Sequence, residues 1–264
     1  MRSKLTTDPF KSTSKYYSQY RIGYPREVIN IFFKEANIKS YEKLLDIGCG
    51  TGKLTFALSD KFKEVIGADI SREMLEEAER QRKTLDLQNI SWLNCSAEKI
   101  NPNLGEFNLI TCGEAFHWMN RDKVARLNYR LLNKEGVFAI FGSNTGSVWS
   151  LSEPWHKPVL DVIQFWLGDK RKNSYWLRKM HIKHEDVLRK CRFKNIKKGI
   201  YQFNYTWTIE SIIGNLYSTS FCNIELLGDN LKNFEKDLVR ALKNFNYKGE
   251  YKELVQVYYI IARK

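Results

Sequence analysis

The heptad DIGCGTG at residues 46–52 is the stretch of this chain with the clearest chemical meaning. An apolar run precedes it and the pattern KLTFAL follows at residues 53–58, which predicts a strand, a glycine-rich turn and a helix. Glycines at alternate positions let the backbone bend tightly and present bare N–H groups to a ligand, and the helix start favours a negative group there. A unit of this kind is typical of sites for adenosine-bearing cofactors.

The spacing of the glycines decides between cofactor classes. A dinucleotide fingerprint has glycines in the order G-x-G-x-x-G, but Lys53 stands at the third position and Gly52 comes one residue early. A phosphate-binding loop is excluded too, because Ile47 replaces its first glycine and Leu54 replaces its Ser or Thr. The heptad instead resembles the D-x-G-x-G-x-G signature of class I S-adenosylmethionine (SAM) dependent methyltransferases. This resemblance implies that SAM is the cofactor and that the loop residues Asp46, Gly48, Cys49 and Gly50 bind it.

Strand and helix patterns alternate through the first half of the chain, as in a parallel sheet covered by helices. With the resemblance, they predict an α/β, Rossmann-like, doubly wound, mostly parallel sheet of seven strands. Helices are expected to begin at Pro25, after Ser71 and at a cap provided by Asp122. The expected strands are 43–46, 64–69, 90–94, 107–112 and 137–141, then an edge strand at 201–205 and a last one at 254–261, with helices at 209–221 and 230–245.

The composition changes after Gly142, where tryptophans and basic residues become frequent. We therefore expect three parts: a SAM-binding core with an N-terminal cover segment at 1–142, an inserted aromatic-rich lid that binds substrate at 143–208, and a return to the core sheet at 209–264. The tryptophans of the expected lid are Trp149, Trp155, Trp166, Trp176 and Trp207.

Ligands of open parallel sheets collect at the carboxyl ends of the strands. Asp69 ends the second expected strand, and the resemblance implies that its carboxylate accepts hydrogen bonds from both ribose hydroxyls; a helix cap is the alternative. The resemblance places Ile70 and Met74 against the adenine, although a core position suits Met74 as well. Around the adenine edge it places Ser96, Ala97 and Glu98, of which Glu98 could equally cap the next turn.

A second signal is the string CGEAFHW at residues 112–118, directly after the fourth expected strand. Its EAFHW part resembles the small-molecule subgroup that contains trans-aconitate methyltransferases. Residues 16–25 resemble that subgroup's Y-x-x-x-R-P-x-Y-P-like start, with Ile22 in place of the first proline. The resemblance implies that Arg21 pairs with the carboxylate of the cofactor and that Glu114 also contacts the cofactor.

Three aromatic side chains are the candidates for contact with the methyl acceptor. His117 could take a proton, donate a hydrogen bond to an acidic acceptor, or satisfy a buried polar position, and we expect it to be the catalytic residue. Trp118 could recognise the acceptor or only pack, and Tyr24 could hydrogen-bond the acceptor or hold the first helix.

The chain has 43 Lys and Arg residues against 30 Asp and Glu residues, so its formal net charge is 43 − 30 = +13. A positive chain attracts anionic partners, which favours an anionic small molecule as the acceptor. The basic residues are spread along the sequence and no nucleic-acid reader motif accompanies them, so a solvated surface is the simpler interpretation. A nucleic acid is therefore not expected as a partner.

The five cysteines are odd in number and include no Cys-x-x-Cys pair, so they predict neither a disulfide framework nor a zinc site, and no metal is expected. Reduced thiols favour a cytoplasmic location. The first residues lack the apolar run of a signal peptide and no segment is long and apolar enough to span a bilayer, so no membrane partner is expected.

Taken together, these features predict a SAM-dependent methyltransferase that acts on a small acid, with carboxylate O-methylation favoured. A carboxylate is already ionised at neutral pH and needs no general base. The alternatives are methylation of RNA or protein, which only the charge supports, and a non-catalytic SAM-binding module. The identity of the acceptor and the oligomeric state do not follow from the sequence.

Overall fold

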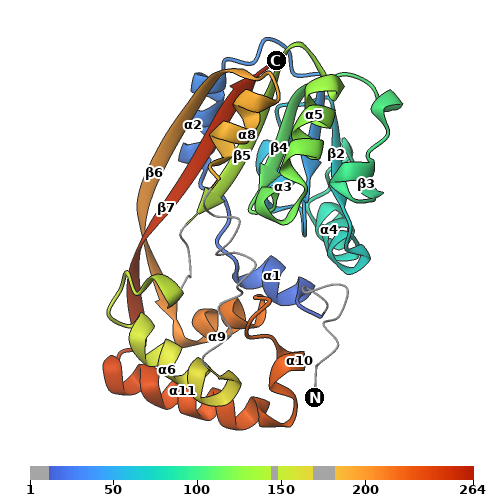
Figure 1. The fold of residues 1–264 in the computed structure, drawn as a ribbon. Helices are drawn as coiled ribbons and strands as arrows, with labels where there is room; N and C mark the ends of the chain where they lie inside the picture. The colour runs from blue at the N-terminus through green and yellow to red at the C-terminus, as the bar shows by residue number, and fades with distance from the viewer. Residues whose placement is uncertain (1–11, 144–147, 169–181) are drawn as a thin grey trace. The chain divides into compact units, whose positions relative to one another are not determined.

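The computed structural model describes residues 12–143, 148–168 and 182–264 (Figure 1). Contacts divide these residues into two compact units. The first unit contains residues 12–22, 148–168 and 202–256, and the second contains 23–143, 182–201 and 257–264. Trp176 of the expected lid lies outside the described residues. The functional division of the chain at residues 142 and 208 stays a prediction.

One seven-stranded sheet organises the described chain, with strand order β3-β2-β1-β4-β5-β7-β6. The pairs from β3 to β5 are parallel, and β7 runs antiparallel to β5. This mixed sheet confirms the predicted α/β, Rossmann-like architecture. The strands are β1 Lys43–Ile47, β2 Glu64–Asp69, β3 Ile90–Asn94, β4 Phe107–Gly113, β5 Leu132–Ser143, β6 Lys194–Thr208 and β7 Glu250–Arg263.

Helices of the second unit flank this sheet (Figure 1). They are α2 Arg26–Ala36, α3 Lys53–Ser59, α4 Arg72–Thr84, α5 Arg121–Leu131 and α8 His184–Lys190, with short 3-10 helices η1 Ala97–Lys99, η2 Pro102–Leu104 and η3 Phe116–Trp118. The first unit contains α1 Ser14–Tyr20, η4 Val148–Ser150, α6 His156–Leu167, α9 Ile209–Tyr217, α10 Ile224–Leu227, η6 Gly228–Asn230 and α11 Leu231–Phe245.

Two helix ends differ from those expected. The cap of α5 is Asn120, whose side chain accepts the Lys123 N–H at 3.2 Å, because the helix begins one residue before Asp122. Helix α9 ends at Tyr217 instead of 221, where the Ser218 hydroxyl donates to the Asn215 carbonyl. Such side-chain bonds to the backbone compete with the continuation of a helix.

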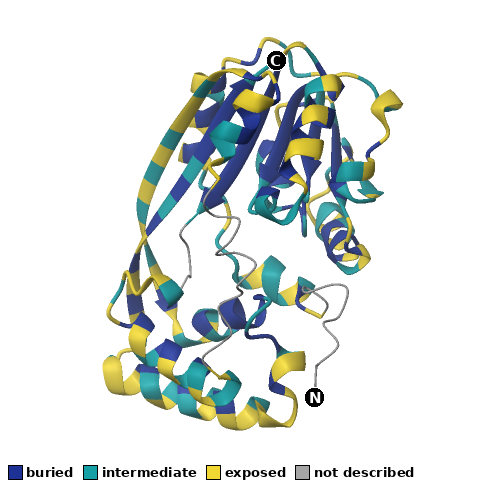
Figure 2. Cartoon of the chain, in the orientation of Figure 1, coloured by how far each residue is buried: buried dark blue, intermediate teal, exposed yellow. Residues whose placement is uncertain are grey.

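The central strands β1, β2, β4 and β5 are largely buried, as the dark blue ribbons of Figure 2 show. Helix α2 contributes Val28, Ile29 and Phe32 to this core because these residues share one face at helical spacing. The second unit therefore has its own packed core, which holds the carboxyl ends of β1, β2 and β4 in fixed register.

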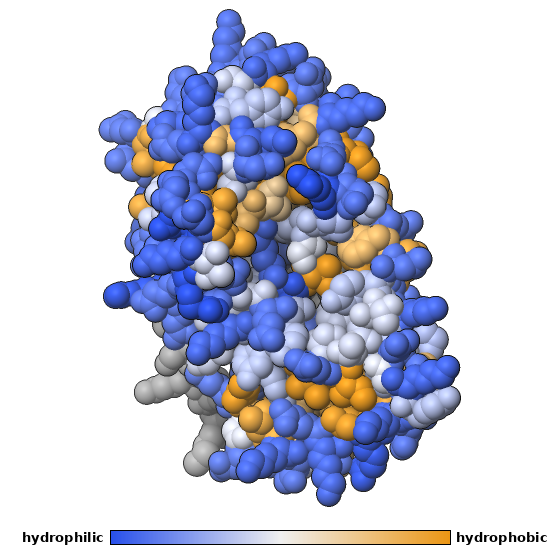
Figure 3. Space-filling model, turned by 180° about the vertical axis from the view of Figure 1, so that it is seen from behind, coloured by the Kyte–Doolittle hydropathy of each residue, from blue (hydrophilic) through white to orange (hydrophobic). Residues whose placement is uncertain are grey.

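Polar side chains dominate the face drawn in Figure 3, with smaller apolar patches between them.

Aromatic residues of the expected lid form much of the core of the first unit. Trp207 is fully buried and its indole N–H donates to Glu253 Oε2 at 2.6 Å. Trp155 lies 5.8 Å from the ring of Tyr251 and donates its N–H to the Lys252 carbonyl. These rings pack within their own unit, so their frequency in the sequence reflects packing as well as any contact with substrate.

Candidate functional site

The glycine loop after β1 has the backbone that its sequence predicts. Gly48, Gly50 and Gly52 have φ angles of +63°, +55° and +84°, in the left-handed region that glycine adopts without steric cost. The N–H groups of Gly48 and Cys49 donate to the Ala68 carbonyl at 2.7 and 3.1 Å. The loop is therefore tied to the end of the neighbouring strand β2.

The glycines of this loop differ in the space around them. A Cβ at Gly48 would lie 2.6 Å from the Cβ of Ala115, so the loop after β4 packs directly against the glycine loop. A Cβ at Gly50 would meet nothing within 4 Å. Gly50 therefore faces open space at the carboxyl end of the sheet, where a ligand of this fold is expected.

Asp69 lies beside that opening. One carboxylate oxygen accepts the Gly50 N–H at 2.8 Å and the other accepts the Ser71 N–H at 2.8 Å. Ser71 is at the N-cap of α4, but its side chain makes no capping hydrogen bond. The Asp69 carboxylate thus joins the glycine loop to the start of α4, which agrees with the helix-cap alternative, and its contact with the ribose stays a prediction.

The two apolar residues expected near the adenine differ in exposure. Ile70 is 74% exposed although it follows a buried strand, whereas Met74 is 4% exposed and packs in the core. An exposed Ile70, an acidic Asp69 and an open Gly50 together fit the adenosine part of SAM. They offer an apolar surface for a base, an acceptor for hydroxyl groups, and room for a close approach to the backbone.

Asp46 lies beneath the loop and is fully buried. Its two carboxylate oxygens accept the hydroxyls of Thr55 at 2.6 Å and Thr111 at 2.8 Å, so it joins β1, α3 and β4. Burial raises the pKa of Asp46 to about 6, against the lowering effect of the two threonine hydroxyls and with a smaller raising effect from Asp69. In this geometry, Asp46 supports the loop through the two threonines, and its contact with the cofactor stays a prediction.

Asp46→Asn tests this support. A folded-state pKa of about 6 lies above the ordinary value of ~3.9, so the carboxyl stabilises the fold most below pH ~4 and loses that contribution as pH rises through about 6. Asparagine does not titrate, and it can accept from one threonine and donate to the other. From pH 4 to 7, the unfolding free energy of the variant should therefore rise by on the order of 3 kcal/mol relative to wild type, measured by urea denaturation. A difference that does not change with pH would refute the shifted pKa.

The stretch 96–98 begins with Ser96 and continues into η1. Ala97 is 6% exposed, and Glu98 Oε1 accepts the backbone N–H of Asn120 at 2.8 Å. Glu98 therefore holds the start of α5, close to the capping role named as its alternative.

Cys49 of the glycine loop is 8% exposed, and burial raises the pKa of its thiol, which makes this thiol unreactive.

The loop after β4 is held in a strained conformation. Glu114 has φ +54°, although it is not a glycine, and its N–H donates to the Phe141 carbonyl at 2.9 Å. Its carboxylate accepts the Ser143 hydroxyl at 2.7 Å. A non-glycine residue in this region costs of order 1–3 kcal/mol, and such strain occurs preferentially at functional sites.

His117 lies in η3 within this loop and is half-buried. Burial, then His184 and Arg121, lower its pKa to about 3, so its imidazole is neutral at pH 7. Trp118 lies beside it, with 5.8 Å between the two ring centroids. A neutral imidazole can exchange hydrogen bonds with a ligand but is a very weak base.

The sequence pattern gave no sign of Arg121 and His184, which surround His117. The Arg121 guanidinium donates to the Ile182 carbonyl at 2.8 Å and lies 3.3 Å from Nδ1 of His184. His184 is in ring contact with Phe116 at 5.2 Å, and burial lowers its pKa to about 4. Arg121 and His184 are 63 positions apart in the sequence, so no local spacing could have indicated that they meet.

Tyr24 and Arg21 lie in different units. Tyr24 precedes α2 and packs against the end of β4, where its hydroxyl would be 2.6 Å from a Cβ at Gly113. Its ring lies edge-on to Phe141 at 5.5 Å. Arg21 ends α1 in the first unit, with its guanidinium 5.3 Å from the ring of Tyr17. Pairing of Arg21 with a cofactor carboxylate stays a prediction, since the glycine loop is in the second unit.

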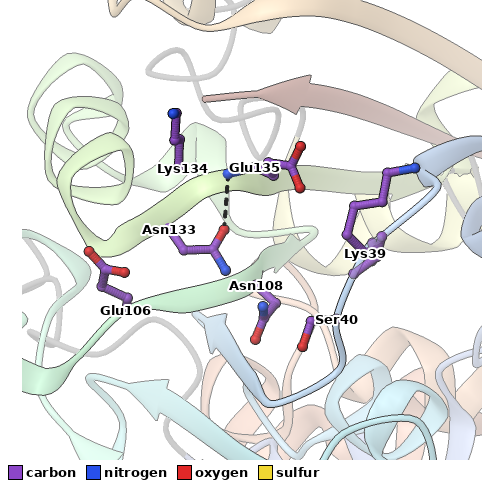
Figure 4. Close-up of a pocket in the computed structure, with 8 residues that line it drawn as sticks. Lys39, Ser40, Glu106, Asn108, Asn133, Lys134 and Glu135 are labelled. Carbon is purple, nitrogen blue, oxygen red and sulfur yellow. Dashed lines mark hydrogen bonds between the residues drawn. The ribbon is translucent and has the colours of Figure 1, made fainter.

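A cavity of about 490 Å³ lies at the other end of the strands, where β4 and β5 begin (Figure 4). Its lining includes Glu106 and Asn108 near the start of β4 and Asn133, Lys134 and Glu135 near the start of β5. Ligands of this fold bind at the carboxyl ends of the strands, so this cavity is not the candidate site. Among the described residues, no helix is long and apolar enough to cross a bilayer, and none of the His, Cys, Asp and Glu side chains form a metal-binding group.

Known proteins share these features. Residues 44–136 match the family model described as a methyltransferase domain. The chain is 34% identical over 131 residues to the "Probable S-adenosylmethionine-dependent methyltransferase CRG1" of Saccharomyces cerevisiae, which covers 48% of this chain and 44% of that protein. It is 24% identical over 264 residues to malonyl-[acyl-carrier protein] O-methyltransferase of Acetivibrio thermocellus, across 97% and 86% of the two chains.

The fold is also found in solved structures. The crystal structure of YcgJ from Bacillus subtilis has a TM-score of 0.55 at 16% identity and aligns over 91% of this chain and 99% of its own. The methyltransferase-domain match spans the glycine loop, Asp69, the 96–98 stretch and the His117 loop. On these grounds residues 44–136 are a methyltransferase domain, and the chain is similar to SAM-dependent methyltransferases.

Proposed function

We propose that this protein transfers a methyl group from SAM to a carboxylate oxygen of a small acid. The observation that carries the choice of acceptor is the neutral state of His117, whose pKa is lowered to about 3. When bound, SAM supplies a methyl group on a positively charged sulfur atom. The chain's own residues then have to align the acceptor with that group and exclude water from the site.

The geometry of the second unit supports the assignment of several cofactor residues. Asp69 would accept hydrogen bonds from the ribose hydroxyls, Ile70 would cover one face of the adenine, and Gly50 would allow close approach. The strained Glu114 would hold the loop that separates cofactor from acceptor. The other assigned cofactor residues, proposed from the resemblance alone, are Arg21, Asp46, Gly48, Cys49, Met74, Ser96, Ala97 and Glu98.

A carboxylate acceptor suits the chemistry of this site better than a phenol or an amine. Phenols and ammonium groups have ordinary pKa values near ~10, so a base must remove their proton before attack. An imidazole whose pKa is about 3 cannot serve as that base at neutral pH. A carboxylate is already ionised, and the neutral imidazole can donate a hydrogen bond that orients it.

Two further observations support this proposal. The positive net charge of +13 favours the approach of an anionic acceptor. One relative, from Acetivibrio thermocellus, is named as an O-methyltransferase and aligns with nearly the whole chain. Membership of the trans-aconitate methyltransferase-like subgroup stays a prediction, as do contacts of Tyr24 and Trp118 with the acceptor.

The direct test is a panel of carboxylic acids and phenols incubated with SAM and the purified protein. Mass spectrometry should detect a gain of one CH₂ group on at least one carboxylic acid and on none of the phenols. Methylation of phenols alone would contradict the proposed acceptor class, and methylation of RNA or protein alone would contradict a small-molecule acceptor.

His117→Ala should lower kcat/KM by roughly ten- to a hundredfold, because a hydrogen bond from the neutral imidazole to the charged acceptor is lost. Affinity for the demethylated product S-adenosylhomocysteine, measured by calorimetry, should stay unchanged. His117→Gln, which keeps a hydrogen-bond donor, should recover part of the activity. The wild-type pH profile should show no ionisation of His117 between pH 5 and 9. An ionisation near pH 6.5 that disappears in His117→Gln would make this residue a general base and refute the proposal.

A further inference from the structure

Basic side chains gather on one surface of the second unit, over α5 and the turn between α8 and β6. Helix α5 exposes Lys123, Arg126 and Arg130, which are three and four residues apart and so share one helix face. Exposed basic residues continue at the end of α8 and into the start of β6. We call the following six residues the basic surface: Lys123, Arg126, Arg130, Lys190, Arg192 and Lys194.

Folding brings together the two parts of the basic surface, which are about 60 residues apart in the sequence. Helices α5 and α8 are in contact, and the Cys191 thiol lies 3.7 Å from the Asp122 carbonyl of α5 (Figure 1). Tyr129 of α5 packs edge-on against Phe193 at 5.3 Å. Burial raises the pKa of the Cys191 thiol, and Arg126 is near enough to oppose that rise. The exposed face of α5 therefore borders the turn that contains Arg192.

The positive charge of this surface is not neutralised within the described part of the second unit. None of its six residues has an ion-pair partner within 4.0 Å among the residues described. The acidic residues nearest in sequence are Asp122, Glu135, Glu185 and Asp186, and Asp186 is paired with Arg189 at 2.9 Å. Part of the net charge of the chain is thus concentrated on one face, which the spread of basic residues along the sequence did not indicate.

We propose that the basic surface is a docking site for an acidic protein. Arg126, Arg130 and Arg192 carry planar guanidinium groups that bind carboxylates in pairs of hydrogen bonds. Lys123 and Arg130 are seven residues apart on α5, about 10 Å along the helix, a length that matches two turns of a partner helix with acidic residues on one face.

The composition of the surface favours a protein over a nucleic acid. Single strands are bound through exposed aromatic rings on which bases stack, and neither α5, α8 nor residues 191–194 carry an exposed aromatic ring. Tyr129 of α5, beside the basic surface, is half-buried, packs on Phe193 and lies under the ammonium group of Lys264 at 5.4 Å. Helix α5 begins three residues after η3, so the partner would stand close to the His117 loop.

Charge reversal tests the docking site. In the triple variant Arg126→Glu, Arg192→Glu and Lys194→Glu, binding of a fluorescent helical peptide of Glu and Ala is measured by anisotropy at low and at physiological salt. The wild-type protein should bind the peptide with a dissociation constant that rises with salt, and the variant should bind at least about tenfold more weakly. No methyl transfer is measured, so this result is independent of the proposed function.

A matched control separates the surface from net charge. Lys34→Glu, Lys39→Glu and Lys63→Glu change the net charge equally at exposed positions outside the basic surface, and this variant should bind the peptide within about threefold of wild type. Unchanged affinity for S-adenosylhomocysteine verifies that both variants fold. The proposal is overturned if the two variants lose equal affinity, or if wild type does not bind the peptide at low salt. It is also overturned if RNA of equal length or phosphatidylserine vesicles bind more tightly than the peptide.

Discussion

Replacement of Asp69 by alanine should weaken the binding of S-adenosylhomocysteine by roughly 1.5–3 kcal/mol, about ten- to a hundredfold, in isothermal calorimetry. The variant loses a charged acceptor that we propose for the ribose hydroxyls. It also loses the two hydrogen bonds, both 2.8 Å long, that hold Gly50 and Ser71. An unchanged dissociation constant would refute the assignment of Asp69 to the ribose.

The two losses can be separated with a modified ligand. An analogue of S-adenosylhomocysteine that lacks the ribose hydroxyls cannot use the carboxylate, so Asp69→Ala should affect its binding only through the loosened loop. The difference between the two ligands gives the coupling between Asp69 and the hydroxyls. A coupling close to zero would mean that Asp69 acts on the loop alone.

Much of the second unit could be predicted because its signals are local. The alternation of apolar runs with glycines and acids located β1, β2 and β3, and the positions of Gly48, Gly50 and Asp69 follow from where those strands end. A strand end is visible in a short window of sequence. The fold class and the position of the glycine loop therefore followed from these patterns together with the family resemblance.

The surroundings of His117 could not be predicted in the same way. Arg121 and His184 meet only because α8 packs on α5, and nothing local in either segment indicates the other. The strain at Glu114 is a backbone property that its residue type conceals. The protonation state of His117 depends on burial, which follows from tertiary packing, so its role as a base could be judged only from the structure.

Packing also gives several candidate site residues a structural role, while their contact with the cofactor stays a prediction. Glu98 holds the N–H of Asn120, and Met74 is buried, whereas Ile70 remains exposed. The tryptophans at 155 and 207 support the core of the first unit with residues from β7. A high frequency of aromatic residues in sequence indicates a packed region but cannot tell a core from a substrate surface.

Alanine at Gly50 should mainly reduce ligand affinity, whereas alanine at Gly48 should mainly reduce stability. Both positions have positive φ, so each substitution costs about 1–2 kcal/mol in backbone conformation. At Gly50 the new methyl group enters open space and should reduce affinity for S-adenosylhomocysteine at least about tenfold, because the cofactor is proposed to occupy that space. At Gly48 the methyl group would lie 2.6 Å from the Cβ of Ala115, so the unfolding free energy should fall by a further ~1–3 kcal/mol.

The double variant Gly48→Ala with Ala115→Gly makes the comparison specific. Removal of the Ala115 methyl group relieves the closest contact, and Met119 Cε at 2.9 Å is the end of a flexible side chain that can move away. Urea denaturation should therefore show that the double variant is more stable than Gly48→Ala alone, with a favourable coupling between the two sites. Because this contact joins the glycine loop to the His117 loop, the same repair should restore methyl transfer. If Gly50→Ala binds S-adenosylhomocysteine as tightly as wild type, the open space at Gly50 is not the cofactor site, whatever the result at Gly48.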